Sequence, residues 1–478
     1  MESAPRNEPG SALKPKLNTS SSLASPTLPR LKSIPCDTMK SNSASFLPPL
    51  SRAQRLFALL LLCGVVLVQT SPSSAGAATP SPAAPVDRAV LQGGEGGYHT
   101  YRIPAAVVTR EGIVVLLVEG RKGTQSDFAA IDLLSVRSQD GGRTWSKTQI
   151  VWSEGSTEGK ISMGNPTPVY DAITGRLWCV FNRENQRVFV TYSDNAGSTW
   201  ARPREITPAV RPASWMRYWT GPGHGLQLTH GKNRGRLVVP SYHLELESVD
   251  GGDTSVIVMR SHMAFSDDHG QTWKIGESTK LASELEGSPA RRLAGKWIPG
   301  EARWHGGECM VEEQDDGRLY LIVRDQARHD GRKAFAWSSD GGETWTPLSL
   351  QPQLPDPGCQ ASLIRYPDPS SPGTKIFLYS GVTIDHRAAK PIGDGGDGTR
   401  AEQVASEMLK GRQRLALYVS SDGCQSWREA GVVQTGPAAY SDLVALPDGD
   451  VLCFYEGGEK NAYESIRMAR LDRKWLHR

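Results

Sequence analysis

Residues 138–145 read Ser-Gln-Asp-Gly-Gly-Arg-Thr-Trp, and this octapeptide determines how the rest of the chain is interpreted. Its pattern returns four times, beginning at Ser193, Ser266, Ser338 and Ser420. The copy at Ser193 has Asn in the Asp place, and the copy at Ser420 has Cys in place of the second Gly. The closing tryptophans are 55, 73, 72 and 82 residues apart, so one structural unit recurs along most of the chain.

Each copy has the chemistry of a tight turn between two β-strands. The Asp side chain can accept hydrogen bonds from backbone amides of its own turn, and Gly adopts the positive φ angles that such turns need. The closing Trp can fold back onto the sheet and bury a large apolar area. Copies follow β-like runs, as at Ile131–Arg137, Arg187–Tyr192 and Leu415–Val419. Strands between turn signals, without long helical periods, predict an all-β fold.

The length of the repeating unit narrows the fold further. A unit of roughly 65–80 residues suits one four-stranded sheet with long loops, and radial repetition of such sheets is a β-propeller. We therefore assign residues 89–478 to a single propeller domain. Two polar stretches without a strand pattern, Ser283–Gly300 and Arg387–Gly411, are expected to be loops inserted on one face, with a short helix near Ala401–Lys410.

Composition and charge exclude several classes of function. Hydrophobic residues make up 38% of the chain and charged residues 22%, which is typical of a chain with a buried core. The formal net charge is +3, and residues 1–77 carry a surplus of five positive charges, which leaves −2 for the remainder. That remainder lacks the basic face of a nucleic-acid binder. No Gly-rich phosphate loop precedes a helix, so a nucleotide is not expected either.

The segment before the propeller has the features of an export signal. Residues 1–50 have no sustained period and are expected to be disordered or over-annotated, with Met39 as the alternative to Met1 as the start. Residues 51–78 contain two arginines, the 13-residue apolar run Leu56–Val68 and a small-residue segment. The run is shorter than the roughly 20 residues of a membrane-spanning helix.

We therefore expect an exported protein, in the periplasm, outside the cell or in another secretory compartment, with no stable membrane span after signal cleavage. An uncleaved membrane anchor is the alternative. Residues 79–88 are rich in Pro and Ala and are expected to form a linker.

No spacing in the sequence predicts a metal site or another cofactor. Cys179 and Cys453 lie in apolar strand-like runs and are expected to be buried thiols. Asp385, Asp394 and Asp397 could be taken for a calcium loop, but solvated loop acids are the better interpretation. His224 lies in the turn-rich segment Gly-Pro-Gly-His-Gly, which could reach a pocket.

Three places combine arginine with the end of a strand-like run: Arg102, Arg324, and the pair Arg412 and Arg414. Arginine is planar, permanently charged and able to bind a carboxylate in a bidentate manner. Three converging guanidinium groups would hold a carboxylate strongly. Each arginine taken alone is more often a surface charge, and sequence cannot show convergence.

The octapeptide resembles the Asp box of the sialidase family, whose fold is a six-bladed propeller. Residues 89–478 would provide about 65 residues per blade. The Asp box alone is a weak guide to activity, because it lies at the blade periphery and also occurs in propellers that are not sialidases. We therefore interpret all five copies as structural.

The same resemblance implies the residues that bind a sialic acid carboxylate. Tyr101-Arg-Ile-Pro104 is similar to the opening motif of the family and implies that Arg102 is the first arginine of the clamp. The second arginine corresponds to Arg324 and the third to Arg412, with Arg414 as the alternative under a local misalignment. Glu456 corresponds to the acid that braces Arg102, and Glu119 and Arg121 are expected to line the same pocket.

The resemblance also implies the catalytic groups: Tyr440 as nucleophile, Glu308 as its base and Asp127 as the general acid. A sialic acid carries a carboxylate on its anomeric carbon, which would repel a carboxylate nucleophile, and sialidases are an exception among glycosidases in using Tyr. A phenol has an ordinary pKa of about 10, so it needs a base close by. Asp127 lies on a loop between two strand-like runs, which suits delivery of a proton to a leaving oxygen.

The sequence therefore predicts a retaining exo-α-sialidase that hydrolyses terminal sialic acid from glycoproteins, glycolipids or oligosaccharides. One alternative is a trans-sialidase, which would use the same residues to pass the sugar to an acceptor. Others are a propeller that binds sialic acid without turnover and a propeller that only scaffolds partners.

Overall fold

The computed structural model describes residues 85–155, 159–248, 255–282, 302–325, 331–368, 373, 375–383 and 412–476. These residues belong to one compact unit, Pro80–Arg478. The expectations for segments 1–50 and 51–78, for the three aspartates of the calcium alternative and for the two inserted loops fall outside the described residues. The first strand begins at Val86, within the segment 79–88 that we expected to be a linker.

Antiparallel sheets follow one another in chain order. The first sheet contains β2 (Thr100–Val108), β3 (Val114–Lys122), β4 (Ala130–Ser138) and β5 (Gln149–Trp152). The second contains β6 (Met163–Asp171), β7 (Arg176–Arg183), β8 (Arg187–Ser193) and β9 (Arg204–Glu205). In both sheets every strand pairs with its neighbour in sequence, which is the simplest way to build a four-stranded unit.

The third sheet is larger than the first two. Its main path contains β10 (Trp215–Thr220), β12 (Leu237–Ser248), β13 (Ser255–Ser266) and β14 (Lys274–Ile275). The short strand β11 (Leu226–Gln227) pairs with β12, and β15 (Ala302–His305) pairs with β13 in parallel. The fourth sheet returns to the simple order and contains β16 (Cys309–Glu313), β17 (Leu319–Val323), β18 (Arg332–Ser338) and β19 (Ser349–Pro355).

The last sheet joins the two ends of the described chain. Its seven strands, in spatial order, are β1 (Val86–Gln92), β25 (Ser465–Leu471), β24 (Val451–Gly457), β23 (Arg428–Ala445), β22 (Gln413–Ser420), β21 (Ile376–Val382) and β20 (Ser362–Tyr366). The 18-residue β23 pairs with β22 along its first part and with β24 along its second part. Because β1 pairs with β25, the first described strand lies beside the last one.

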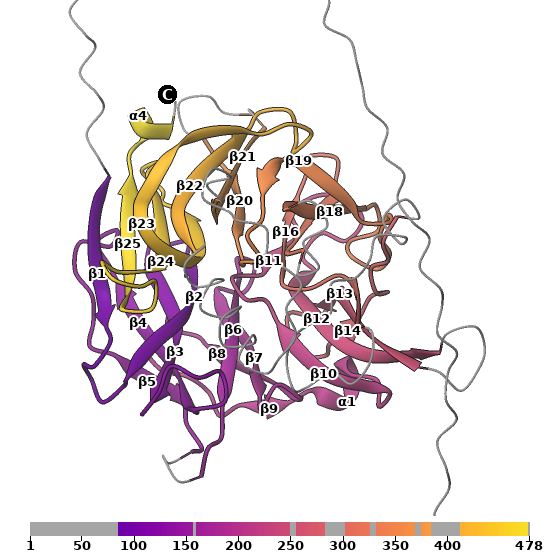
Figure 1. The fold of residues 1–478 in the computed structure, drawn as a ribbon, viewed down its shortest axis with the longest axis horizontal. Coiled ribbons are helices and arrows are strands. Elements are labelled where there is room, and N and C mark those ends of the chain that lie inside the picture. Colours follow the sequence, from indigo (N-terminus) through magenta and orange to yellow (C-terminus); the bar gives the residue numbers. More distant parts are fainter. Residues whose placement is uncertain are drawn as a thin grey trace, which may run out of the picture. The chain divides into compact units, whose positions relative to one another are not determined.

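The sheets follow one another around a common centre (Figure 1). Strands β2, β6, β12, β16, β20 and β23 contact one another in that order, and β23 contacts β2 again, so the contacts form a closed cycle. The arrangement is all-β and propeller-like, as the sequence predicted. In the described ranges the helices are α1 (Thr207–Val210) and α4 (Arg473–Leu476), and none is long and apolar enough to cross a bilayer.

All five octapeptides connect strands at the outer side of a sheet. They join β4 to β5, β8 to β9, β13 to β14, β18 to β19 and β22 to β23. In the first copy the Asp140 carboxylate accepts bonds from the Thr144 backbone (2.8 Å) and hydroxyl (2.6 Å). The Gly142 amide donates to the Ser138 hydroxyl at 2.8 Å. The predicted turn is therefore confirmed.

The fifth octapeptide keeps this geometry although Cys424 replaces the glycine. Cys424 has a φ of 67° and still donates its backbone N–H to Ser420 at 2.9 Å. The Asp422 carboxylate accepts from the Ser426 backbone N–H at 3.0 Å, as in the first copy. The side-chain bonds of the turn therefore hold a non-glycine residue in a conformation that is uncommon for it.

We expected each octapeptide tryptophan to pack on its own sheet; in the structure these side chains also fill the space between neighbouring sheets. Trp145 meets Phe454 of the last sheet edge-on, with ring centroids 5.7 Å apart. Trp273 is 3% exposed and shares one apolar cluster with Trp178 of the second sheet. The reason is geometric: sheets that radiate from a centre diverge outward, and a large ring fills the wider outer gap.

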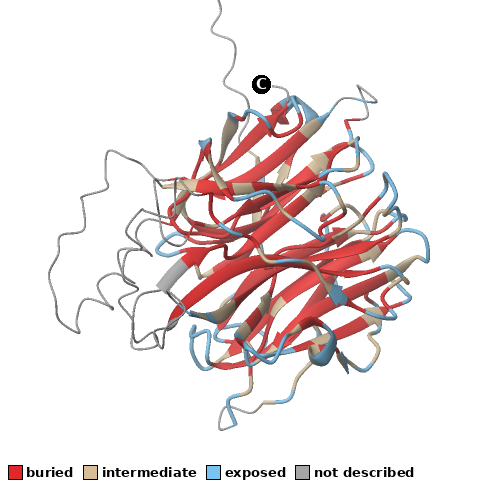
Figure 2. Cartoon of the chain, turned by 90° about the vertical axis from the view of Figure 1, so that its right-hand side faces the viewer, coloured by how far each residue is buried: buried red, intermediate tan, exposed pale blue. Residues whose placement is uncertain are grey.

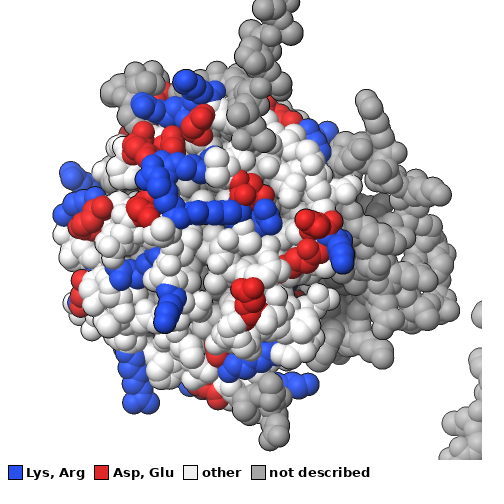
Figure 3. Space-filling model, turned by 90° about the vertical axis from the view of Figure 1, so that its left-hand side faces the viewer, with Lys and Arg blue, Asp and Glu red and all other residues white. Residues whose placement is uncertain are grey.

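Burial follows the strands, and the connecting loops carry most of the exposed residues (Figure 2). The cores lie between adjacent sheets; one, for example, joins Val115 and Leu117 of β3 to Cys179 and Phe181 of β7. Cys179 and Cys453 are fully buried free thiols, as predicted. Figure 3 views the side on which β1 lies, where acidic and basic side chains are interspersed.

Candidate active site

Arg102 lies on β2, at an irregularity that frees backbone donors. β2 is an edge strand, and its ladder with β3 shifts register between Arg102 and Ala105. Ile103 adopts a φ of 57°, which is unusual for a β-branched residue. Its N–H donates to Glu456 Oε1 of β24 at 2.9 Å. The last sheet thus satisfies a donor at the open edge of the first sheet.

Glu456 also holds the side chain of Arg102. Arg102 donates from Nε to Glu456 Oε1 at 2.9 Å and from Nη2 to Oε2 at 3.0 Å, a bidentate pair in which Glu456 is 0% exposed and Arg102 6%. Burial alone would lower the pKa of Arg102, but the neighbouring groups, with Glu456 first among them, together outweigh burial and raise that pKa. The guanidinium therefore stays charged in a fixed orientation.

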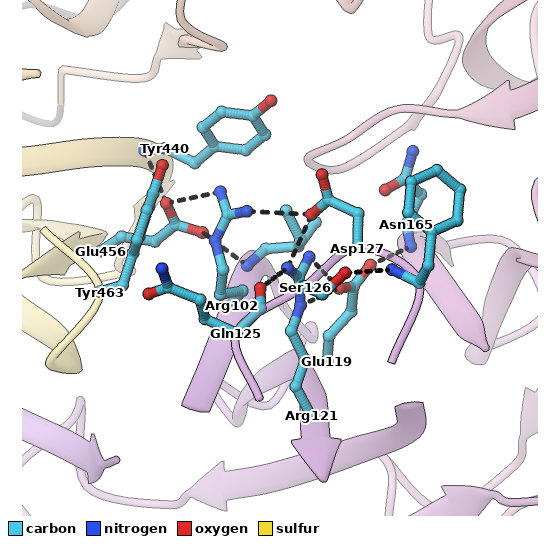
Figure 4. A network of polar contacts seen from close by, with 12 residues as sticks. Arg102, Glu119, Arg121, Gln125, Ser126, Asp127, Asn165, Tyr440, Glu456 and Tyr463 are labelled. Atoms are coloured by element: carbon cyan, nitrogen blue, oxygen red, sulfur yellow. Dashed lines mark hydrogen bonds and ion pairs between the residues drawn. The ribbon is translucent and has the colours of Figure 1, made fainter. Parts of the chain in front are cut away.

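Asp127 lies on the loop between β3 and β4, beside Arg102 (Figure 4). Its Oδ1 accepts from Arg121 Nη1 at 2.6 Å and from Arg102 Nη1 at 3.3 Å, and its side chain is 66% exposed. Desolvation would raise the pKa of Asp127, but the charges of Arg121 and Arg102 outweigh it and lower the pKa below its ordinary value. Asp127 is thus ionised in the ligand-free protein.

Arg121 is in turn held by Glu119, two residues earlier on β3. Arg121 donates from Nε at 2.9 Å and from Nη2 at 2.6 Å to the same Glu119 oxygen. The other oxygen of Glu119 accepts from the backbone N–H of Asn165 on β6 at 2.9 Å. Both side chains are buried. This chain of contacts fixes the inner end of the loop that carries Asp127.

Tyr440, on β23, reaches two residues that flank strands of the fourth sheet: Glu308 directly before β16 and Arg324 directly after β17. Its hydroxyl donates to Glu308 Oε1 and accepts from Arg324 Nη1 at 2.9 Å. Arg324 Nη1 also donates to Glu308 Oε2 at 2.8 Å. Burial and the neighbouring charge of Glu308 raise the pKa of Tyr440 well above its ordinary value. The phenol is therefore protonated, with a carboxylate placed to accept its proton.

Arg412 completes the cluster around the Tyr440 ring. The guanidinium carbons of Arg412 and Arg102 lie 5.3 and 5.2 Å from the ring centroid. Arg412 donates from Nη1 to the Tyr463 hydroxyl at 2.7 Å. Arg414, the alternative for the third arginine, instead forms a bidentate pair with Glu429 at 2.7 and 2.9 Å. Arg412 is therefore the arginine that reaches the site.

All the candidate residues predicted from the sequence lie in one connected network of side chains: Arg102, Glu119, Arg121, Asp127, Glu308, Arg324, Arg412, Tyr440 and Glu456. Tyr463 was not predicted from the sequence; its ring centroid lies 4.2 Å from the Arg102 guanidinium carbon, and its hydroxyl accepts a bond from Arg412. Asn165 was not predicted either. Neither residue has a motif or spacing that would have singled it out.

The family of the chain follows from a sequence comparison. Residues 115–453 match the BNR repeat-like domain family, which covers the octapeptide region. The chain is 29% identical to the sialidase of Micromonospora viridifaciens, over 90% of this chain and 60% of that protein. It is 27% identical to mouse sialidase-3, over 77% of this chain and 90% of that protein. The chain spans less than two thirds of the bacterial relative and most of the mouse relative.

Solved structures agree on the fold. A Hadza microbial sialidase superposes with a TM-score of 0.62 at 23% identity, over 81% of this chain and 68% of that chain. An intramolecular trans-sialidase from Ruminococcus gnavus superposes with a TM-score of 0.58 at 17% identity, over 80% of this chain and 96% of that chain. The fold is thus that of propeller-like proteins, and the curated sialidase relatives place the chain among the glycoside hydrolases. Within that class, the chain belongs to the sialidase family.

Proposed function

We propose that this protein is a retaining exo-α-sialidase with Tyr440 as its nucleophile. The observation that carries the proposal is the contact of the Tyr440 hydroxyl with Glu308 and Arg324, inside a ring of buried arginines. The substrate class is a terminal α-linked sialic acid on a glycoprotein, glycolipid or oligosaccharide. The sialidase and exo-α-sialidase relatives support this choice.

The arginines Arg102, Arg324 and Arg412 bind the sialic acid carboxylate. The four arginines of the network face four carboxylates, so the site is formally neutral before substrate enters. A bound carboxylate adds one negative charge. Protonation of Asp127 restores the balance, so substrate binding favours the form of Asp127 that can donate a proton. The exposed position of Asp127 suits delivery of that proton to the leaving glycosidic oxygen.

Tyr440 then attacks the anomeric carbon. Its proton moves to Glu308 Oε1 as the oxygen–carbon bond forms and the glycosidic bond breaks, and the aglycone leaves with the proton of Asp127. Water, deprotonated by Asp127, afterwards attacks the anomeric carbon as its bond to the Tyr440 oxygen breaks. The phenol takes its proton back from Glu308, and Asp127 is again protonated. The raised pKa of Tyr440 is the reason that this step needs the adjacent base.

Two further parts of the proposal concern architecture and location. We propose six blades, in which β23 contributes its first part to one blade and its second part to the next. The two pairings of β23 and the closed cycle of inner strands support this count. We also propose export through the segment 51–78, supported by its basic, apolar and small-residue regions in order.

The test is release of a fluorescent aglycone from an α-sialoside by the purified full chain. Tyr440→Phe should remove nearly all turnover and leave binding of the 2,3-didehydro analogue of sialic acid intact. Tyr366→Phe is the matched control, because it loses a buried hydroxyl that donates to Gly449 O at 2.6 Å outside the network. Full activity in Tyr440→Phe would overturn the mechanism. A wild type that binds the analogue without turnover would favour the propeller that only binds sialic acid. Formation of sialylated lactose when lactose is added would favour the trans-sialidase.

A further inference from the structure

Asp442 lies two residues after Tyr440 in the sequence, and its side chain forms hydrogen bonds with several parts of the ring of sheets. It is 0% exposed. Its Oδ2 accepts the Ala106 N–H at 2.8 Å, and its Oδ1 accepts from Ser362 Oγ at 2.8 Å. His224 Nδ1 lies 2.8 Å from the same Oδ1, and it donates there because a carboxylate only accepts. Asp442 thus joins β23 to β2, to β20 and to the loop between β10 and β11.

These contacts matter because no ladder places Tyr440. The pairing of β23 with β24 shifts register between Ala438 and Ser441, so the ladder is interrupted at Tyr440. β2, which carries Arg102, lies in a different sheet from β23. Side chains must therefore set the distance between the nucleophile and the arginine. Glu456 provides one link, through Arg102 and the backbone N–H of Tyr440, and Asp442 provides the second.

The loop that presents His224 is held tightly. Gly221 donates to Pro240 O at 2.7 Å, and Gly225 donates to Pro168 O at 2.9 Å. Gly223 has a φ of 109°, which favours glycine, and a Cβ there would lie 2.5 Å from the sulfur of Met310, so the Met310 side chain would have to shift. Burial would lower the pKa of His224, but Asp442 outweighs burial and raises it. A rigid loop thus offers a fixed donor to Asp442.

We propose that Asp442, held by His224 and Ser362, is a positioning group for the reaction. It sets Tyr440 against Glu308 and Arg102 without touching the substrate. The inference rests on the proposed sialidase activity. A displacement of about 1 Å at reacting atoms can cost on the order of 100-fold in rate. Loss of the Asp442 contacts should therefore lower kcat while the arginines still bind the carboxylate.

Asp171 offers a matched control elsewhere in the molecule. It is also 0% exposed, and its Oδ2 lies 2.9 Å from His269 Nδ1. It also accepts from the Ile173 backbone N–H at 3.0 Å and the Thr174 hydroxyl at 2.7 Å. Its partners lie in the turn after β6, on β11 and in the third octapeptide, outside the network of Tyr440. Asp171→Asn therefore reproduces the loss of a buried carboxylate paired with histidine, without a predicted effect on the nucleophile.

The experiment compares Asp442→Asn and Asp171→Asn in the full chain for kcat, KM, affinity for the 2,3-didehydro analogue and melting temperature. We expect both variants to have a lower melting temperature than the wild type. Asp442→Asn alone should lose about 10- to 100-fold in kcat, with analogue affinity changed less than about threefold. His224→Asn, which keeps a donor near the Nδ1 position, should retain more kcat than His224→Leu.

Wild-type kcat in folded Asp442→Asn, or equal kcat losses in Asp442→Asn and Asp171→Asn, would overturn the positioning role and leave the sialidase proposal intact. If Asp442→Asn does not fold, the comparison of His224→Asn with His224→Leu decides, and equal kcat in these two variants would overturn the inference. An inactive wild type would instead reject the proposed function itself.

Discussion

Replacement of Glu456 by Gln tests whether one buried ion pair holds the first and last sheets together. Glu456 accepts two bonds from the Arg102 guanidinium and two from the backbone N–H groups of Ile103 and Tyr440. Gln keeps the shape but loses the charge, and it turns an NH₂ group toward at least one donor. The buried Arg102 guanidinium would then keep only the longer contact with the Asp127 carboxylate, at 3.3 Å.

The expected cost follows from the burial of the pair. The Arg102 and Glu456 side chains are 7% and 0% exposed, and removal of one partner of such a pair costs about 3–5 kcal/mol. The bidentate pair of Arg414 with Glu429 has similar geometry, but its side chains are 38% and 34% exposed. An exposed pair contributes about 0–1 kcal/mol, so Glu429→Gln should cost far less.

The assay is urea unfolding of both variants and the wild type, followed by tryptophan fluorescence at neutral pH. We expect the free energy of unfolding to fall by about 3–5 kcal/mol in Glu456→Gln and by less than about 1 kcal/mol in Glu429→Gln. Equal costs below about 1 kcal/mol in the two variants would refute the argument, because burial would then make no difference to the pair.

Three other changes have defined outcomes. Trp273→Ala should lower the free energy of unfolding by about 3–5 kcal/mol, measured by denaturant titration, because the ring is 3% exposed in an intersheet core. The bond from the Thr144 hydroxyl lowers the pKa of Asp140 below its ordinary 3.8. The ionised carboxylate therefore stabilises the folded protein above that pH, and this contribution is lost as the pH falls further. In Asp140→Asn the melting temperature should consequently fall less steeply at acidic pH than in the wild type. Asp127→Ala should impair release of a sugar aglycone much more than release of an activated aryl aglycone in parallel rate assays, since a good leaving group needs less protonation.

The octapeptides made most of the fold predictable. Their turns depend on contacts within eight residues, such as those of Asp140 with Thr144, so the local sequence is enough to specify them. The strands before the octapeptides could also be located, because each is a β-like run that ends at the start of a turn. The double pairing of β23 was not predictable, because it depends on which strands lie on either side of one long segment.

The sequence also supplied the candidate residues of the site, because their types and order could be matched to a known family. It favoured Arg412 and kept Arg414 as the alternative, since the two are two residues apart in the same strand context. The folded chain separates them, because Arg412 approaches the Tyr440 ring and Arg414 pairs with Glu429.

Local sequence alone thus determined the turns, the strands and the chemical types available at the site. Only the tertiary structure decided how Arg102 near the start of the ring meets Glu456 and Tyr440 near its end, through contacts between residues more than 300 positions apart. The same holds for Asp442, whose partners Ala106, His224 and Ser362 come from three other segments. Such contacts arise when the ring closes, and they depend on the packing of whole sheets, which no short stretch of sequence specifies.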